Sequence, residues 1–220
     1  MKTLTAAVVL TALPLAAAAQ DPVKVNAGQY KVLIDNAAVR VLKVAVSPGS
    51  KTAIHSHPDA MLVSLQDSKA QFTLPDKTTQ DMSIGKETAA YTPATTHVSA
   101  NVGTTPVDAL LVEFKAKVPG NATLPATREG VQLNVLAESP RAIAFKTIAA
   151  PDFQEAAGTT HDYDQVVISL GANDMSLAVE GKPVVTNWQR GHAQFIGRGV
   201  KHESKNTSGR PIDFVIVAIR

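Results

Sequence analysis

The chain of 220 residues contains no cysteine. Disulfide bonds, thiolate metal sites, Cys-x-x-Cys redox motifs and cysteine nucleophiles are therefore excluded. A bound metal ion would have to be held by histidine, carboxylate, amide or thioether groups. The sequence also lacks an evident Ser-His-Asp arrangement, phosphate-binding loop or dinucleotide-binding glycine fingerprint, so no other catalytic chemistry competes.

Aromatic and charged residues are both scarce. Phe, Trp and Tyr make up 5% of the chain and charged residues 18%, with a formal net charge of only +2. Lysine and arginine form no cluster that could follow a phosphate backbone, and there are few rings on which bases could stack. We therefore expect no nucleic-acid partner.

No apolar run is long enough to span a membrane. Residues 1–20, MKTLTAAVVLTALPLAAAAQ, combine a positive start at Lys2, a short apolar run interrupted by proline, and small residues in an A-x-A pattern. This layout predicts a secretory signal peptide cleaved near Ala19 or Gln20, and a buried N-terminal helix is the alternative. The mature chain is expected to be exported, to the periplasm or the extracellular space, with no membrane span.

The two halves of the remaining chain resemble each other in sequence. VLIDNAAVRVLKVAVSP (32–48) aligns without a gap to VLAESPRAIAFKTIAAP (135–151), and HVSAN (97–101) aligns to HESKN (202–206). Ordered matches of this kind indicate an internal repeat. We expect one domain over residues 21–118 and another over 131–220, joined by a linker (119–130) rich in Pro, Gly and Thr.

Each repeat has the pattern of an all-β protein. Short runs rich in β-branched and apolar residues predict strands at 39–46, 60–65, 70–74 and 108–114. Turn residues follow at 75–77 and 180–183. No long stretch has helical periodicity, so a sandwich or barrel is expected.

The histidines are not scattered. His55 and His57 are two positions apart before a strand-like run, so both side chains point to one face. If no bulge intervenes, Met61 points to that face as well. The late histidines, His97 and His202, occupy matching positions in the two repeats.

These spacings resemble the motifs of the cupin superfamily, and specifically its two-domain members, the bicupins. Gly49 is followed by five residues and then His55-Ser-His57, while Pro93, His97 and Asn101 resemble the second cupin motif. Repeat two shows that second motif nearly complete, as Gly191, Gly197, Gly199, His202 and Asn206. The resemblance implies two tandem cupin barrels, also called double-stranded β-helices or jelly rolls.

The resemblance also implies metal ligands. His55, His57 and His97 match three cupin ligands, while Ala60 or Met61 stands where the family has a glutamate. Three neutral imidazoles suit Fe, Zn, Ni, Mn or Cu and leave coordination positions open. In repeat two the matching positions are Thr159, His161, Gln165 and His202, which would form at most a weak secondary site.

Met61 and Tyr91 are expected to line the pocket of the first barrel. A Met61 thioether beside the three imidazoles would favour copper, although methionine more often fills gaps in a core.

Two function classes stay open. The first is a metal-dependent enzyme, dioxygenase-like or a lyase or isomerase, acting on a small anionic chelating organic molecule. The second is a non-catalytic exported bicupin that binds a metal or a small ligand. An acid–base residue on the inner wall of the first barrel would separate them, and Gln71, Thr73 and Tyr91 are the candidates. The sequence leaves metal, substrate and oligomeric state open.

Overall fold

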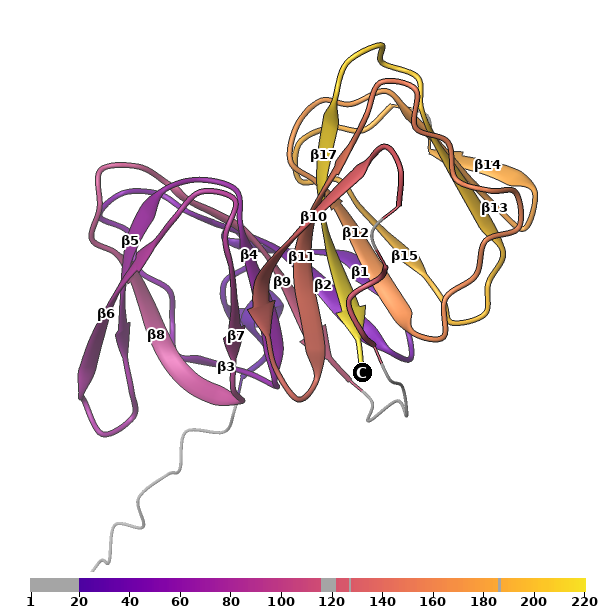
Figure 1. Ribbon diagram of the computed structural model, residues 1–220. Coiled ribbons are helices and arrows are strands. Elements are labelled where there is room, and N and C mark those ends of the chain that lie inside the picture. The colour runs from indigo at the N-terminus through magenta and orange to yellow at the C-terminus, as the bar shows by residue number, and fades with distance from the viewer. Residues whose placement is uncertain (1–19, 116–121, 127, 186) are drawn as a thin grey trace, which may run out of the picture.

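The computed structural model describes residues 20–115, 122–126, 128–185 and 187–220 (Figure 1). These residues form seventeen strands and one short helix, α1 (Pro22–Val25), so the predicted all-β class is confirmed. The expected leader up to residue 19 lies outside the described residues, as do residues 119–121 and 127 of the expected linker. In the described part of the chain, no helix is both long and apolar enough to cross a membrane.

The N-terminal half, residues 20–115, contains two sheets. One has the strand order β1-β2-β9-β4-β7 and the other β3-β8-β5-β6. The nine strands are β1 (Tyr30–Asp35), β2 (Val39–Val46), β3 (His55–His57), β4 (Ala60–Ser64), β5 (Ser68–Thr73), β6 (Thr79–Ile84), β7 (Ala89–Thr92), β8 (Thr95–Asn101) and β9 (Val107–Phe114).

The C-terminal half, residues 122–126, 128–185 and 187–220, repeats this topology. Its sheets have the orders β10-β11-β17-β12-β15 and β14-β13-β16, which correspond to those of the N-terminal half except that β3 has no counterpart strand. Thr159 bridges to His202 where His55 pairs with His97, so the structural register agrees with the sequence repeat. The eight strands are β10 (Val131–Glu138), β11 (Ala142–Ala149), β12 (Asp164–Ser169), β13 (Met175–Val179), β14 (Lys182–Val185), β15 (Ala193–Ile196), β16 (His202–Asn206) and β17 (Ile212–Ile219).

The predicted turns fall between strands. Lys77 has a φ of 69° between β5 and β6, and Glu180 and Gly181 have φ of 52° and 72° between β13 and β14. Positive φ at these positions is typical of tight hairpin connections.

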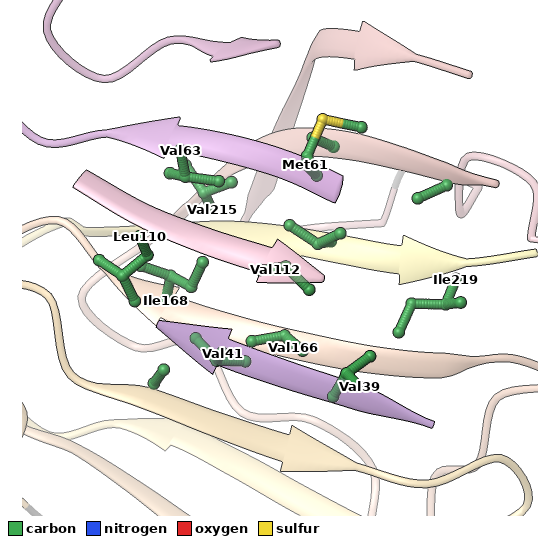
Figure 2. Close-up of a cluster of buried hydrophobic side chains, with 14 of the residues drawn as sticks. Val39, Val41, Met61, Val63, Leu110, Val112, Val166, Ile168, Val215 and Ile219 are labelled. Carbon is green, nitrogen blue, oxygen red and sulfur yellow. The ribbon is translucent and has the colours of Figure 1, made fainter. Parts of the chain in front are cut away.

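The two five-stranded sheets face each other in the middle of the molecule (Figure 1). Figure 2 shows the layer between them, where side chains of β2, β4 and β9 pack against side chains of β12 and β17. We call this layer the interhalf core. Its fully or largely buried members are Val39, Val41, Met61, Val63, Leu65, Leu110, Val112, Phe114, Ala142, Ala144, Val166, Ile168, Leu170, Ala193, Val215, Val217 and Ile219.

Strand β9 is buried on both faces. Leu110 and Val112 point into the interhalf core, whereas Ala109 and Leu111 point into the core of the N-terminal half. A strand with two apolar environments needs a nearly continuous apolar run, and VDALLVEF has one. Of its two carboxylates, Glu113 lies on the same face as Leu111 and therefore on the side of the N-terminal half, whereas Asp108 lies on the face of Leu110 and pairs with Arg190.

Polar contacts add to the interface between the halves. Arg190 pairs with Asp108 at 2.7 Å, and Lys146 pairs with Glu87 at 2.6 Å. Gly191 has a φ of 78°, and a Cβ atom there would lie 2.9 Å from a methyl group of Leu65. Glycine at this position therefore permits both the left-handed turn and the close approach of the two halves.

Replacing Leu110 with alanine tests the interhalf core. Leu110 is fully buried, so we expect the free energy of unfolding to fall by about 2–5 kcal/mol in urea titrations. Val32→Ala is the control, because Val32 is 37% exposed on β1 and its truncation should change stability by no more than about 0.5 kcal/mol. Equal losses in both variants would contradict the assigned interface.

Candidate metal centre

The three predicted histidines of the N-terminal half come together. Strand β3 places His55 and His57 on one face, and its antiparallel pairing with β8 sets His97 opposite His55. The ring centroids are 4.8 Å apart for His55–His57, 4.8 Å for His55–His97 and 5.6 Å for His57–His97. All three side chains are buried, and each offers a nitrogen within 4.8 Å of the others.

Hydrogen bonds fix the tautomers of two of these rings. His55 Nδ1 lies 2.8 Å from the carbonyl oxygen of Ala53, and a carbonyl only accepts, so Nδ1 carries the proton. The lone pair of His55 Nε2 accepts a hydrogen bond from the Tyr30 hydroxyl at 3.1 Å. His57 Nδ1 donates to Glu113 Oε1 at 2.6 Å, so Nε2 is the ring nitrogen left for a metal ion.

Glu113 begins a buried chain of charges behind the histidines. Its other oxygen, Oε2, accepts from Arg40 Nε at 2.5 Å, and Arg40 Nη1 donates to Asp21 at 2.5 Å. Burial alone would raise the pKa of Glu113, but the hydrogen bonds from His57 and Arg40 outweigh it and hold the pKa below its usual value. Glu113 is therefore a carboxylate that orients His57.

The surroundings of His55 and His97 favour the neutral imidazole. Burial, followed by the neighbouring His55 and His57, lowers the pKa of His97 to about 3. Burial likewise lowers the pKa of His55, although its contact with the Ala53 carbonyl opposes the shift. Neutral imidazole is the form that binds metal, so the site is prepared for one at neutral pH.

A cavity of about 370 Å³ opens beside the histidines. His57, His97 and Tyr30 contribute to its lining, and so does Tyr91, which pairs with Met61 and also packs against the interhalf core. Gln71, one of the acid–base candidates, instead hydrogen-bonds Asp81 at an exposed position.

The placement of Met61 has to be corrected. Met61 is fully buried in the interhalf core, on the face of β4 opposite to Ala60 and Leu62 (Figure 2). The strand breaks at Pro58 and Asp59 between β3 and β4, so the alternation that starts at His57 does not carry on to Met61. A copper–thioether site at these histidines is therefore excluded.

The strand register also identifies the position of the missing glutamate. Ala60 pairs with Glu113 as Gln165 pairs with Ala218, so Ala60 is the counterpart of Gln165. A methyl group therefore stands where the cupin motif has its fourth ligand. In the C-terminal half, Ala218 replaces Glu113 and Ile143 replaces Arg40, which leaves no equivalent of the buried chain of charges.

A second cluster lies in the C-terminal half. His161 and His202 come together as expected, but the third group within 4.8 Å is Glu155, which the sequence motif did not indicate. Gln165 lines the same small cavity, of about 60 Å³. Glu155 is already bound by Arg128 at 2.9 Å and by the Ser204 hydroxyl at 3.0 Å.

The sequence motifs did not indicate Tyr30 or Glu113 either. Glu113 could have been noticed, since it is a carboxylate that follows the apolar run of residues 109–112 within a strand. Tyr30 carries no such signal, because it lies in β1, 25 residues before His55. The exposed ring of His192 lies 5.2 Å from Trp188 and takes no part in either cluster.

Comparison with known proteins gives structural likeness only. No family model matches the chain, and no curated protein matches it. A cupin 2 conserved barrel domain protein from Leptotrichia buccalis is similar in structure, with a TM-score of 0.55 and 8% identity over 87% of this chain and 88% of that one.

Two enzymes are also similar in structure. Salicylate 1,2-dioxygenase from Pseudoaminobacter salicylatoxidans, solved with gentisate, gives a TM-score of 0.60 at 11% identity, over 84% of this chain and 70% of that one. A variant of oxalate decarboxylase from Bacillus subtilis gives a TM-score of 0.59 at 11% identity, over 87% and 75%. At such low identity the likeness concerns the fold alone, and the fold is that of cupin-domain proteins.

Proposed function

We propose that the chain is an exported bicupin that binds a divalent transition metal ion through His55, His57 and His97. Its two halves are interpreted as tandem cupin barrels, residues 21–118 and 131–220, that follow a cleaved leader of about 20 residues. The observation that carries the proposal is the convergence of three buried imidazoles, with His57 oriented by the Glu113 carboxylate.

The donor set fits a borderline transition metal. Three imidazole nitrogens suit Fe, Zn, Ni, Mn or Cu, and the adjoining cavity leaves room for substrate. No carboxylate stands among the three ligands, so a bound ion would keep its full charge and polarise an oxygen atom of an anionic chelating molecule.

The function that these residues support best is a metal-dependent enzyme, dioxygenase-like or a lyase or isomerase. Tyr30 supplies the acid–base group that the sequence left unidentified. Burial raises the pKa of Tyr30 to about 12, so its hydroxyl stays protonated at neutral pH and can donate a hydrogen bond. It would lose His55 Nε2 as an acceptor when that nitrogen binds a metal, and its proton would then be free for a bound molecule.

A non-catalytic metal- or ligand-binding protein is the second candidate. It is favoured by the cavity wall, because no carboxylate or amine side chain occurs among the described residues that line it. Elemental analysis of protein purified from its exported compartment separates the candidates. Iron supports oxygenase chemistry, stoichiometric zinc, nickel or manganese supports lyase or isomerase chemistry, and absence of metal supports ligand binding alone.

Removing one histidine from each half tests which half binds the metal. His97→Ala leaves two of three nitrogens, so we expect metal affinity to fall at least 100-fold and the purified protein to lose its metal. His202→Ala should keep the wild-type metal-to-protein ratio, because Glu155 in that cluster is already paired with Arg128. Loss of metal only in His202→Ala would reverse the assignment, and equal losses would show that both halves bind.

Glu113→Gln tests the orientation of His57. The amide keeps the size of the side chain but removes the charge that holds His57 Nδ1–H, so metal affinity should fall about 10-fold. Glu87→Gln is the matched control, because Glu87 pairs with Lys146 between the halves, and its metal affinity should equal wild type. A competition titration with a chelator measures both, and unchanged affinity in Glu113→Gln would show that the carboxylate has no such role.

Acid stability of the metal-free protein tests the buried imidazoles. Unfolded His97 takes up a proton below about pH 6.5, while folded His97 stays neutral down to about pH 3. The unfolded state then binds more protons, so the free energy of unfolding falls as the pH falls through this window, by on the order of 2–3 kcal/mol at pH 4.

The variant His97→Asn should lose much less stability between pH 7 and pH 4 than the wild type. His192→Asn is the control, because His192 is exposed, and it should follow the wild-type profile. Urea unfolding at each pH gives the comparison. If His97→Asn and wild type showed the same pH dependence, His97 would not be buried in its neutral form.

A further inference from the structure

The cavity beside the three histidines is walled by apolar side chains. These come from both sheets of the N-terminal half, so the apolar character is a property of the whole wall. Six of them are Val44, Leu62, Phe72, Met82, Ile84 and Leu111. The volume of about 370 Å³ lies within the range of about 300–1,000 Å³ typical of sites for small organic molecules.

Several polar side chains of the cavity lie at the histidine end. Tyr30 donates to His55, and its ring centroid lies 5.7 Å from that of His57. Ser99 lies two residues after His97 on β8 and therefore on the same face. Together with the imidazoles, these groups form one polar end.

Away from the histidine end the wall has few polar side chains: Gln80 is exposed on β6, whereas Asn101 and Thr92 have partners within the protein. The Asn101 amide donates to the carbonyl oxygens of Val46 and Thr105, and its oxygen accepts from Gly103. The Thr92 hydroxyl donates to Ala60. Among the described lining residues there is no lysine, arginine, aspartate or glutamate.

This distribution restricts what can enter. A charged group held away from the histidines would lose its water without gaining a counter-charge or a hydrogen bond, which is costly. One anionic oxygen-donor group at the histidine end would instead be neutralised by the metal ion.

We infer that the site takes a mainly hydrophobic molecule with a single chelating oxygen head, such as a catechol or an enolised dicarbonyl, and an uncharged apolar body. The inference rests on the proposed function, since the head is held by the metal. It excludes small dicarboxylates and polyols as substrates, because these carry charge or hydroxyl groups at both ends.

Binding of a homologous series to the zinc-loaded protein tests the inference. Zinc is redox-silent, so catechol, 4-methylcatechol, 4-propylcatechol and 4-butylcatechol can be titrated calorimetrically without turnover. Each buried methylene should raise affinity about fourfold, at roughly 0.8 kcal/mol per CH₂. Oxalate should bind more weakly than 4-butylcatechol.

Two variants at neighbouring positions distinguish the contribution of the apolar wall to binding from that of the metal. Met82 on β6 lines the cavity, whereas Ser83 is exposed on the other face of the same strand. Met82→Lys places a charge in the apolar wall and should reduce the gain from catechol to 4-butylcatechol at least fivefold, with unchanged zinc content. Ser83→Lys should keep the wild-type series.

The outcomes test the proposed metal binding and the inferred substrate class separately. Absence of stoichiometric zinc binding in the wild type would overturn the proposed function, and this inference with it. Stoichiometric zinc with affinities independent of chain length, or with oxalate bound more tightly than 4-butylcatechol, would overturn the inference alone. Equal effects of Met82→Lys and Ser83→Lys would show that the apolar body does not lie along this wall.

Discussion

The double burial of β9 is the constraint on which the rest of the molecule depends. Its even-numbered residues, such as Leu110 and Val112, join the two halves, and its odd-numbered residues face the interior of the N-terminal half. Because side chains alternate strictly, a slip of one residue would move Glu113 away from His57 and place a charge in the interhalf core. The interface between the halves and the geometry of the histidine cluster are thus set by one register.

The two halves show how one topology supports different electrostatics. In the N-terminal half the charges stand behind the histidines, where Arg40 compensates Glu113, and His57 and His97 line the cavity with His55 beside them. In the C-terminal half the carboxylate of Glu155 stands beside His161 and His202 and is compensated by Arg128. Two imidazoles with an already paired carboxylate offer fewer free donor atoms to a metal ion than three imidazoles do.

Much of the fold could be predicted from the sequence because it follows from local pattern. The predicted strand at 39–46 coincides with β2. His55, His57 and His97, which the histidine spacing indicated, lie together in the structure. Met61 was misplaced because the break at Pro58 and Asp59 resets the alternation, and nothing in the residue types fixes the face on which a strand resumes. Tyr30, Glu113 and Glu155 reach their clusters through long-range pairing, which no local spacing encodes.

The apolar wall and the neutral histidines have a common physical origin. Burial is the main cause that lowers the pKa of both His55 and His97, so the side chains that exclude water from the cavity also keep the nitrogen lone pairs free of protons. The same exclusion strengthens the field of any dication bound there, since fewer water molecules screen it. A more polar wall would admit more highly charged molecules, but it would also let protons compete for the ligands. The exclusion of water by this wall therefore bears both on which molecules the cavity admits and on the protonation of His55 and His97.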